Sequence, residues 1–183
     1  MKTVQPIRDP KKITKMKTLL RARGEKYAIM FSLGINSGLR VSDVLNLKVG
    51  DVQGKDHITV KEKKTGKNKR FLLNSSLQKE LNAYIASSGL SADEYLIQSR
   101  KGKNKPISRI QAYRILNEEG HSLNLDEVGT HTMRKTFGYH HYKKYHDVAM
   151  LQDIFNHSAP SITLRYIGIT DDEKDKSMED FYL

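Results

Sequence analysis

The spacing of apolar residues in the first part of the chain predicts three helices. Asp9 followed by Pro10 is typical of a helix start, and residues 10–23 then repeat apolar side chains every three or four positions. The mostly apolar stretch 25–37 predicts a second, buried helix that ends at Gly38, and residues 41–47 predict a short third one. The face of the first helix that we expect to turn inward holds Ile13, Met16, Leu19 and Leu20.

The pattern then changes to an alternation of apolar and polar residues, which is typical of strands. We predict three short strands over residues 49–53, 57–63 and 69–73. The periodicity of the remaining chain predicts helices over 75–87, 108–119, 132–145, 147–156 and 161–167. The expected fold is therefore mainly α with a small three-stranded antiparallel β-sheet, an α+β class.

The composition excludes several classes of protein and of site. The chain has 183 residues and no Cys, which excludes disulfides, thiolate zinc sites and cysteine nucleophiles. No apolar run approaches the roughly 18–20 residues that span a bilayer, and the first residues lack the apolar core of a signal peptide. We therefore expect a cytoplasmic protein that has no membrane partner.

The net charge indicates the kind of partner. Lys and Arg total 32 against 21 Asp and Glu, which gives +11 at pH 7. Residues 171–183 hold six acidic and two basic side chains, so residues 1–170 carry about +15. A body this basic favours nucleic acid as a partner, with a merely soluble basic domain as the alternative. The side chains that we expect to contact phosphates are Lys63, Lys67, Lys69, Arg100, Lys101, Lys103 and Lys105.

Three segments carry side chains that suit phosphate chemistry. Arg40 stands at a helix junction, where its planar guanidinium can bind a phosphate, and Asp43 one turn later can orient it. The lysine-rich turn at 63–67 offers a flexible ammonium that can protonate a leaving oxygen. His131 and Arg134 share a face at a predicted helix start, where free N–H groups also favour anions.

Two residues later in the chain complete the set of candidates. His157 follows a predicted helix, and Tyr166 lies nine residues after it. A tyrosine hydroxyl has a pKa near 10, so it needs cations around it to act as a nucleophile at neutral pH. Taken singly, each candidate also fits an ordinary structural role, such as a helix cap or a core tyrosine. The histidines lack the spacing of a compact zinc motif, and we expect no metal site.

Taken in order, these residues resemble the active site of the tyrosine recombinase (phage integrase) family. Arg40, a turn lysine, His131-x-x-Arg134, His157 and Tyr166 have the order and spacing of that family. The resemblance covers the chain from about residue 8 to residue 166 and implies the fold of the family's catalytic domain. The two segments similar to its signature motifs are Ser37-Gly38-Leu39-Arg40-Val41-Ser42-Asp43 and His131-Thr132-Met133-Arg134-Lys135-Thr136-Phe137.

The resemblance implies a role for each candidate residue. Tyr166 is implied to be the nucleophile that forms a 3′-phosphotyrosine link, and Lys64 to protonate the leaving 5′-hydroxyl. Asp43 is implied to support the site. Because the covalent link preserves the phosphodiester bond energy, no cofactor is expected. The side chains implied to bind the scissile phosphate are Arg40, His131, Arg134 and His157.

The same resemblance implies a function and a set of partners. It implies a DNA integrase or recombinase that cuts and rejoins strands in site-specific recombination. The implied partners are double-stranded DNA, further copies of the chain on that DNA, and accessory DNA-binding proteins, with a nucleoid location when DNA is bound. A covalent topoisomerase of type IB and a basic DNA-binding module without catalysis remain alternatives.

The chain departs from the family pattern in two places. Asn156 stands where members usually have Gly, and Asn tolerates left-handed backbone angles. Typical members also have a helical DNA-binding domain upstream, whereas few residues precede the first predicted helix here. We therefore predict a catalytic domain at residues 1–170, an acidic C-terminal tail at residues 171–183, and no separate N-terminal core-binding domain.

Overall fold

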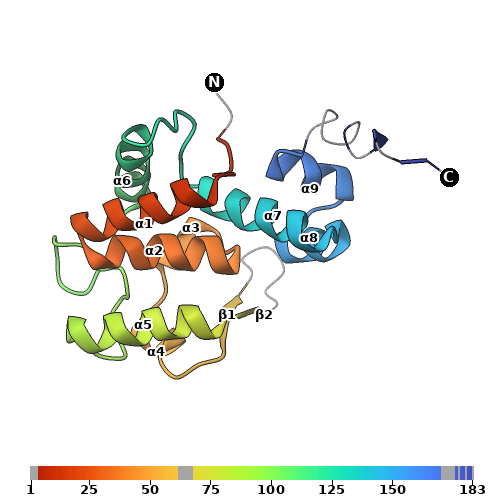
Figure 1. Ribbon diagram of the computed structural model, residues 1–183. Coiled ribbons are helices and arrows are strands. Elements are labelled where there is room, and N and C mark those ends of the chain that lie inside the picture. The colour runs from red at the N-terminus through yellow and green to blue at the C-terminus, as the bar shows by residue number, and fades with distance from the viewer. Residues whose placement is uncertain (1–3, 62–67, 170–175, 177, 180, 183) are drawn as a thin grey trace.

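Helix α2 (Glu25–Ser37) lies at the centre of the fold, and other helices pack around it (Figure 1). The computed structural model describes residues 4–61 and 68–169, together with 176, 178, 179, 181 and 182. Helices α1 (Pro10–Arg23), α5 (Ser75–Ser88) and α7 (Thr132–Tyr145) each pack against α2. This position explains the apolar sequence of α2, whose fully buried side chains include Ala28, Ile29, Met30, Phe31 and Leu33.

The remaining elements, most of them short, connect or cover these four helices. All the helices that the sequence predicts are present, with ends within two residues of the predicted ones. In the described part of the chain, no helix is both long enough and apolar enough to cross a membrane. The other elements are α3 (Val41–Leu45), α4 (Val49–Val52), β1 (His57–Lys61), β2 (Asn68–Leu72), α6 (Arg109–His121), α8 (Val148–Phe155) and α9 (Pro160–Ile167).

The prediction of a strand over residues 49–53, the first of the three predicted strands, is wrong. This segment forms helix α4, and the sheet of the described residues contains two antiparallel strands, β1 and β2. Val49 and Val52 are both buried, and a spacing of three residues puts them on one face of a helix, whereas in a strand they would lie on opposite faces. Asp51 decides between the two, because its carboxylate accepts a hydrogen bond of 2.8 Å from the Lys48 amide and caps the turn.

Side-chain caps fix the starts of helices α1 and α8. Asp9 accepts a hydrogen bond of 2.8 Å from the amide of Lys11 at the start of α1, as the sequence predicts. Asp147 accepts one of 2.8 Å from the amide of Met150 in the first turn of α8. The cap at the other end of α8 is Asn156, with φ of 55° and ψ of 47°. The left-handed turn that we expect at this residue is therefore present.

The core has two parts, and the smaller one carries α9. The larger part surrounds α2, whereas the smaller one lies among α7, α8 and α9 and contains Leu151, Phe155 and Ile167. Gly138 on α7 brings these helices close together. A Cβ atom at Gly138 would lie 2.6 Å from Cγ2 of Ile167 and 2.7 Å from the Phe155 ring, so no larger residue fits there without displacing α8 or α9.

Candidate active site

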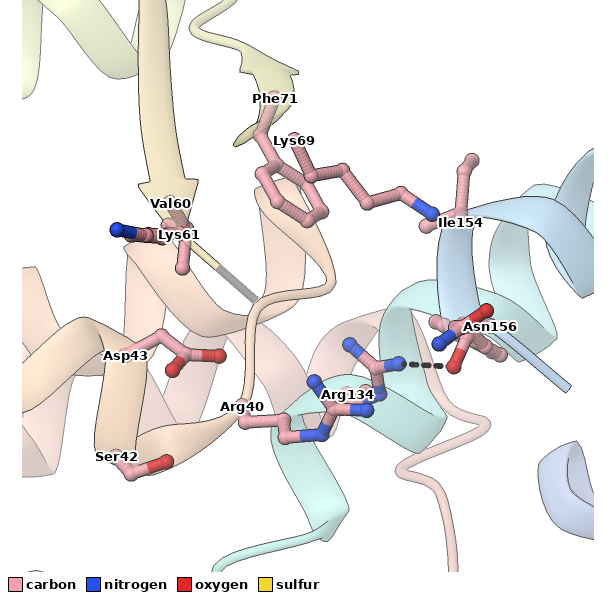
Figure 2. Close-up of a pocket in the computed structure, with 11 residues that line it drawn as sticks. Arg40, Ser42, Asp43, Val60, Lys61, Lys69, Phe71, Arg134, Ile154 and Asn156 are labelled. Atoms are coloured by element: carbon pink, nitrogen blue, oxygen red, sulfur yellow. Dashed lines mark hydrogen bonds between the residues drawn. The ribbon is translucent and has the colours of Figure 1, made fainter. Parts of the chain in front are cut away.

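A cavity of about 370 Å³ opens where α3, the two strands, the first turn of α7 and the end of α8 meet (Figure 2). Four of its lining side chains are cationic and one is a carboxylate. Such a lining attracts an anion and suits a phosphate group. The charged residues that line it are Arg40, Asp43, Lys61, Lys69 and Arg134.

Arg134 is held rigidly at the floor of this cavity. Its side chain is only 5% exposed. The guanidinium donates to the carbonyl of Gly38, at the end of α2, and donates at 3.0 Å to the carbonyl of Phe155, at the end of α8. The guanidinium also lies 4.3 Å from the centre of the Phe155 ring. Burial lowers the pKa of Arg134 to about 10, against the opposing effect of the Tyr166 hydroxyl, so the group stays charged at neutral pH.

Arg40 lies beside Arg134 and is exposed (Figure 2). It caps the start of α3 with extended backbone angles, which directs its side chain to the cavity. In the described residues no ion pair joins Arg40 to Asp43. The Asp43 carboxylate instead points toward the cavity and raises the pKa of Arg134. Arg40 therefore offers its donors to a bound anion.

Tyr166 lies on α9 with its hydroxyl next to His131. The hydroxyl oxygen is 3.2 Å from Nδ1 of His131. The Tyr166 ring packs edge to face on His157 at 5.1 Å and on Phe155 at 5.5 Å between centroids. Burial raises the pKa of Tyr166, while the charges of Arg134 and Arg40 lower it. The phenol is thus placed in the field of both arginines, as its use as a nucleophile requires.

The two histidines are electrically neutral at pH 7. Partial burial lowers the pKa of His131, and the nearby charges of Lys135 and Arg134 lower it further. A neutral ring can accept the hydroxyl proton of Tyr166 at Nδ1. Burial likewise lowers the pKa of His157, with Arg134 adding to the effect.

His157 follows the left-handed turn at Asn156, and its Nδ1 contacts the hydroxyl of the fully buried Thr163 at 3.0 Å. The same hydroxyl also lies 3.5 Å from the carbonyl oxygen of Ala159; when it donates to the closer Nδ1 instead, the ring proton lies on Nε2, which can then donate to a phosphate oxygen. The turn therefore sets the orientation that a phosphate donor needs.

The candidate lysine Lys64, with Lys63 and Lys67, lies outside the described residues. The strands β1 and β2, which precede and follow these residues in the sequence, place Lys61 and Lys69 at the cavity. Lys69 extends toward α8, where its ammonium contacts Asp153 (Figure 2). Lys69, which the sequence suggests only as a DNA contact, therefore lies in the candidate site itself.

The basic loop with Arg100, Lys101, Lys103 and Lys105 is exposed and lies at the other end of α2. Lys26, near the start of α2, donates to the carbonyl of Gln98 at 2.7 Å, whereas Gly38, at its end, accepts from Arg134. A helix of 13 residues spans about 20 Å. The loop and the candidate site are therefore separated by about the length of this helix.

Two further residues near the site were not singled out by the sequence. Arg109 lines a smaller hollow of about 120 Å³ together with Arg40, His131 and Arg134. Lys135 is 7% exposed, and its ammonium lies 5.1 Å from the centre of the Tyr166 ring. The available signal for Lys135 was its spacing of four from His131, which puts both on one helix face. In the described residues no group of three or more His, Cys, Asp or Glu could hold a metal ion.

Comparisons with known proteins identify relatives of this chain. Residues 10–173 match the model of the phage integrase family. The chain is 50% identical over 172 residues to the probable integrase/recombinase YoeC of Bacillus subtilis strain 168, covering 94% of this chain and 93% of that protein. It is 30% identical over 154 residues to a tyrosine recombinase of Pseudothermotoga lettingae, covering 83% of this chain and 52% of that protein.

A solved structure has the same fold. The structure of the XerH site-specific recombinase bound to a palindromic difH substrate, a post-cleavage complex, matches with a TM-score of 0.77 and 16% identity. The match covers 98% of this chain and 53% of that one. The chain thus spans nearly all of YoeC but about half the length of the other two proteins. The mainly helical fold with a small antiparallel sheet is that of a tyrosine recombinase catalytic domain.

Proposed function

The chain belongs to the phage integrase family, and on that basis we propose that it is a DNA recombinase that cuts and rejoins strands through a covalent 3′-phosphotyrosine intermediate. The observation that carries this proposal is the hydroxyl of Tyr166 at 3.2 Å from Nδ1 of His131. Beside this pair, Arg40 and Arg134 line one cavity. A nucleophile, a proton acceptor and fixed cations therefore meet in one place.

The geometry supports an in-line attack on the scissile phosphate. The Tyr166 oxygen bonds to phosphorus while neutral His131 accepts the phenolic proton, and the bond from phosphorus to the 5′-oxygen breaks. Charge builds on the nonbridging oxygens in this step, and fixed cations such as Arg40 and Arg134 stabilise it. Lys64 is our candidate for the proton donor to the leaving oxygen. The 5′-hydroxyl of a partner strand reverses these steps and rejoins the DNA.

Covalent trapping tests this function. DNA carrying a nick just 3′ of the scissile phosphate releases a short 5′ fragment on cleavage, so religation fails and the adduct accumulates. We expect an adduct on the 3′ phosphate that survives denaturing electrophoresis and also forms in EDTA, because arginine, lysine and histidine side chains supply the stabilising donors. An absence of adduct on cognate DNA would favour a non-catalytic DNA-binding module.

Binding to DNA is expected to depend strongly on salt. If about six lysine and arginine side chains contact phosphates, affinity falls about 10³-fold between 50 and 200 mM salt. The double substitution Lys101→Gln with Lys103→Gln should weaken binding to all sequences alike and reduce the slope of log affinity against log salt by about 2. Titrations at several salt concentrations measure both quantities.

A matched control separates this loop from net charge. Lys11 and Lys15 are exposed on α1, and their double substitution by Gln removes the same charge. We expect the control pair to keep the salt slope of the wild type. If both double variants have the same slope of log affinity against log salt, the basic loop does not contact DNA, and the contacts lie in the region of the cavity.

We further propose that residues 1–170 form the catalytic body and that the acidic tail, residues 171–183, contacts another copy of the chain on DNA. Among its described residues, Met178, Phe181 and Tyr182 are 65%, 64% and 96% exposed. Exposed apolar side chains on an acidic segment suit a basic protein surface with apolar patches. The proposal gives the tail a role in assembly rather than in chemistry.

Deleting residues 171–183 tests this role. We expect cleavage of a single nicked site to persist, while complexes that hold two sites together become weaker, as measured by gel shift with two labelled DNAs. Exchange of strands between two DNAs identifies a recombinase, whereas a topoisomerase reseals its own strand. Unchanged two-site complexes after the deletion would show that the tail has no part in assembly.

A further inference from the structure

The N-terminal segment, residues 4–8, is bonded along α7. The amide of Ile7 donates to Oγ1 of Thr136 at 2.9 Å, and Nε2 of His140 contacts the carbonyl of Ile7 at the same distance. Ile7 is 1% exposed and Thr136 is equally buried. The segment is therefore fixed to the helix that carries the second arginine of the candidate site, although it precedes that helix by more than a hundred residues.

Lys135 joins this segment to the candidate nucleophile. Its ammonium donates to the carbonyl of Val4 at 2.7 Å, and it also lies 5.1 Å from the centre of the Tyr166 ring. An ammonium near the face of an aromatic ring is attracted by the ring, and the attraction increases when the ring carries negative charge. Lys135 is thus placed both to fix the ring and to favour the phenolate that develops during attack.

Arg8 ties the same segment to the end of the nucleophile helix. Its guanidinium donates at 3.1 Å to the carbonyl of Gly168, the left-handed cap of α9 with φ of 80°. A Cβ atom at Gly168 would lie 2.8 Å from Nη2 of Arg8, so the two groups are in direct contact. Helix α9 is therefore held at two points, at the Tyr166 ring and at its final turn.

We propose that Lys135 and Arg8 are positioning residues for Tyr166, with the N-terminal segment as their shared anchor on α7. Neither side chain lines the cavity that we assign to the scissile phosphate. The inference rests on the proposed function for the role of Tyr166, while the contacts themselves belong to the free protein. It assigns to residues 4–8 a part in the reaction that their distance along the sequence from Arg40 and Arg134 does not suggest.

The effect of Lys135 on Tyr166 depends on pH. Burial lowers the pKa of Lys135, and the carboxylate of Glu127 opposes this in part. The titratable groups around the ammonium are Glu127, His131 and Tyr166. Lysine is charged below its pKa, so its attraction for the phenolate is present below that value and is lost as the pH rises through it.

The variant Lys135→Met keeps the packed stem and removes the ammonium. We expect unchanged DNA affinity and adduct formation about tenfold slower at neutral pH. The ratio of wild-type to variant rate should shrink as the pH rises, because the wild type loses its own ammonium charge. Lys135→Arg, which keeps a cation and a donor for Val4, should recover part of the rate. A ratio that is constant with pH would indicate packing alone and overturn the proposal.

A measurement on the free protein separates this inference from the proposed function. In protein with ¹³C-labelled tyrosine, an NMR titration reports the pKa of each phenol, and Tyr166→Phe identifies the signal that belongs to Tyr166. Lys135→Met should raise the pKa of Tyr166, and an unchanged value would overturn the inference. This readout needs no cleavage. If the wild type forms no adduct, the proposed function fails, while the titration still decides the role of Lys135.

Arg8 is tested with a charge-matched control. Arg8→Ala should slow adduct formation several-fold without changing DNA affinity or the pKa of Tyr166, whereas Lys11→Ala removes the same charge from an exposed position and should match the wild type. The double variant Arg8→Ala with Lys135→Met should slow adduct formation by less than the product of the two single-variant factors, because both residues act on the placement of one side chain. If the double variant is slowed by the full product of the two factors, or if Arg8→Ala forms the adduct at the wild-type rate, the proposal that the two residues share one anchor is overturned.

Discussion

The substitution Tyr166→Phe is expected to abolish the covalent adduct with DNA, a loss of about 10⁴-fold or more in the rate of cleavage. The change removes only the hydroxyl, which is the atom that would bond to phosphorus. The ring stays, and with it the edge-to-face contacts with Phe155 and His157. Since the lost hydroxyl contacts are the one to His131 and the interaction with Arg134, the free energy of unfolding should fall by about 1 kcal/mol.

Adduct formation on nicked DNA and thermal unfolding measure the two effects. Binding of Tyr166→Phe to intact DNA is the control and should equal that of the wild type. An adduct that persists in this variant would move the nucleophile to another tyrosine. Tyr142 and Tyr145 on α7 are the next candidates, and Tyr145 is the more accessible at 58% exposed.

The two arginines are expected to have equal importance for cleavage but different importance for the fold. Arg40→Lys and Arg134→Lys should each lower the cleavage rate by about 10²–10³-fold, because one ammonium cannot replace the planar pair of donors. Arg134→Ala should also destabilise the protein by about 2–4 kcal/mol, since it leaves the buried carbonyls of Gly38 and Phe155 without a donor. Arg40→Ala should change stability by about 0.5 kcal/mol at most.

Single-turnover cleavage and urea unfolding of the four variants separate these effects. The Lys variants are the better test of chemistry, because they keep the positive charge and bind DNA. A wild-type cleavage rate in Arg40→Lys would exclude Arg40 from the site. Equal stability of Arg40→Ala and Arg134→Ala would contradict the structural role of the buried guanidinium.

Local sequence was sufficient to predict most of the fold. Helix starts such as Asp9–Pro10 depend on groups within a few residues, and the left-handed turn at Asn156 depends on the residue itself. The predicted strand at 49–53 is wrong because two valines three residues apart share a face in a helix but not in a strand, and a contact from the Asp51 carboxylate caps the helical turn. The spacing of apolar residues carries no information about such a hydrogen bond.

The candidate site was predictable only in part, for a related reason. The spacing of His131 and Arg134 is local to one helix turn, but their meeting with Tyr166 depends on how α9 packs on α7. Lys135 escaped notice because its partners, Val4 and Tyr166, lie far from it along the chain. The role of Lys64 stays a prediction, since that residue lies outside the described part of the chain.

The close contact at Gly138 has a consequence for how the protein tolerates mutation. The packing distance between α7, which carries Arg134, and α9, which carries the proposed nucleophile Tyr166, depends on the lack of a side chain at this position. Even a methyl group there would reduce cleavage while leaving DNA binding intact. It pushes α9 away from α7 but does not change the basic surface. A genetic screen for variants that still bind DNA but no longer cut it should therefore recover changes at Gly138, which does not line the cavity.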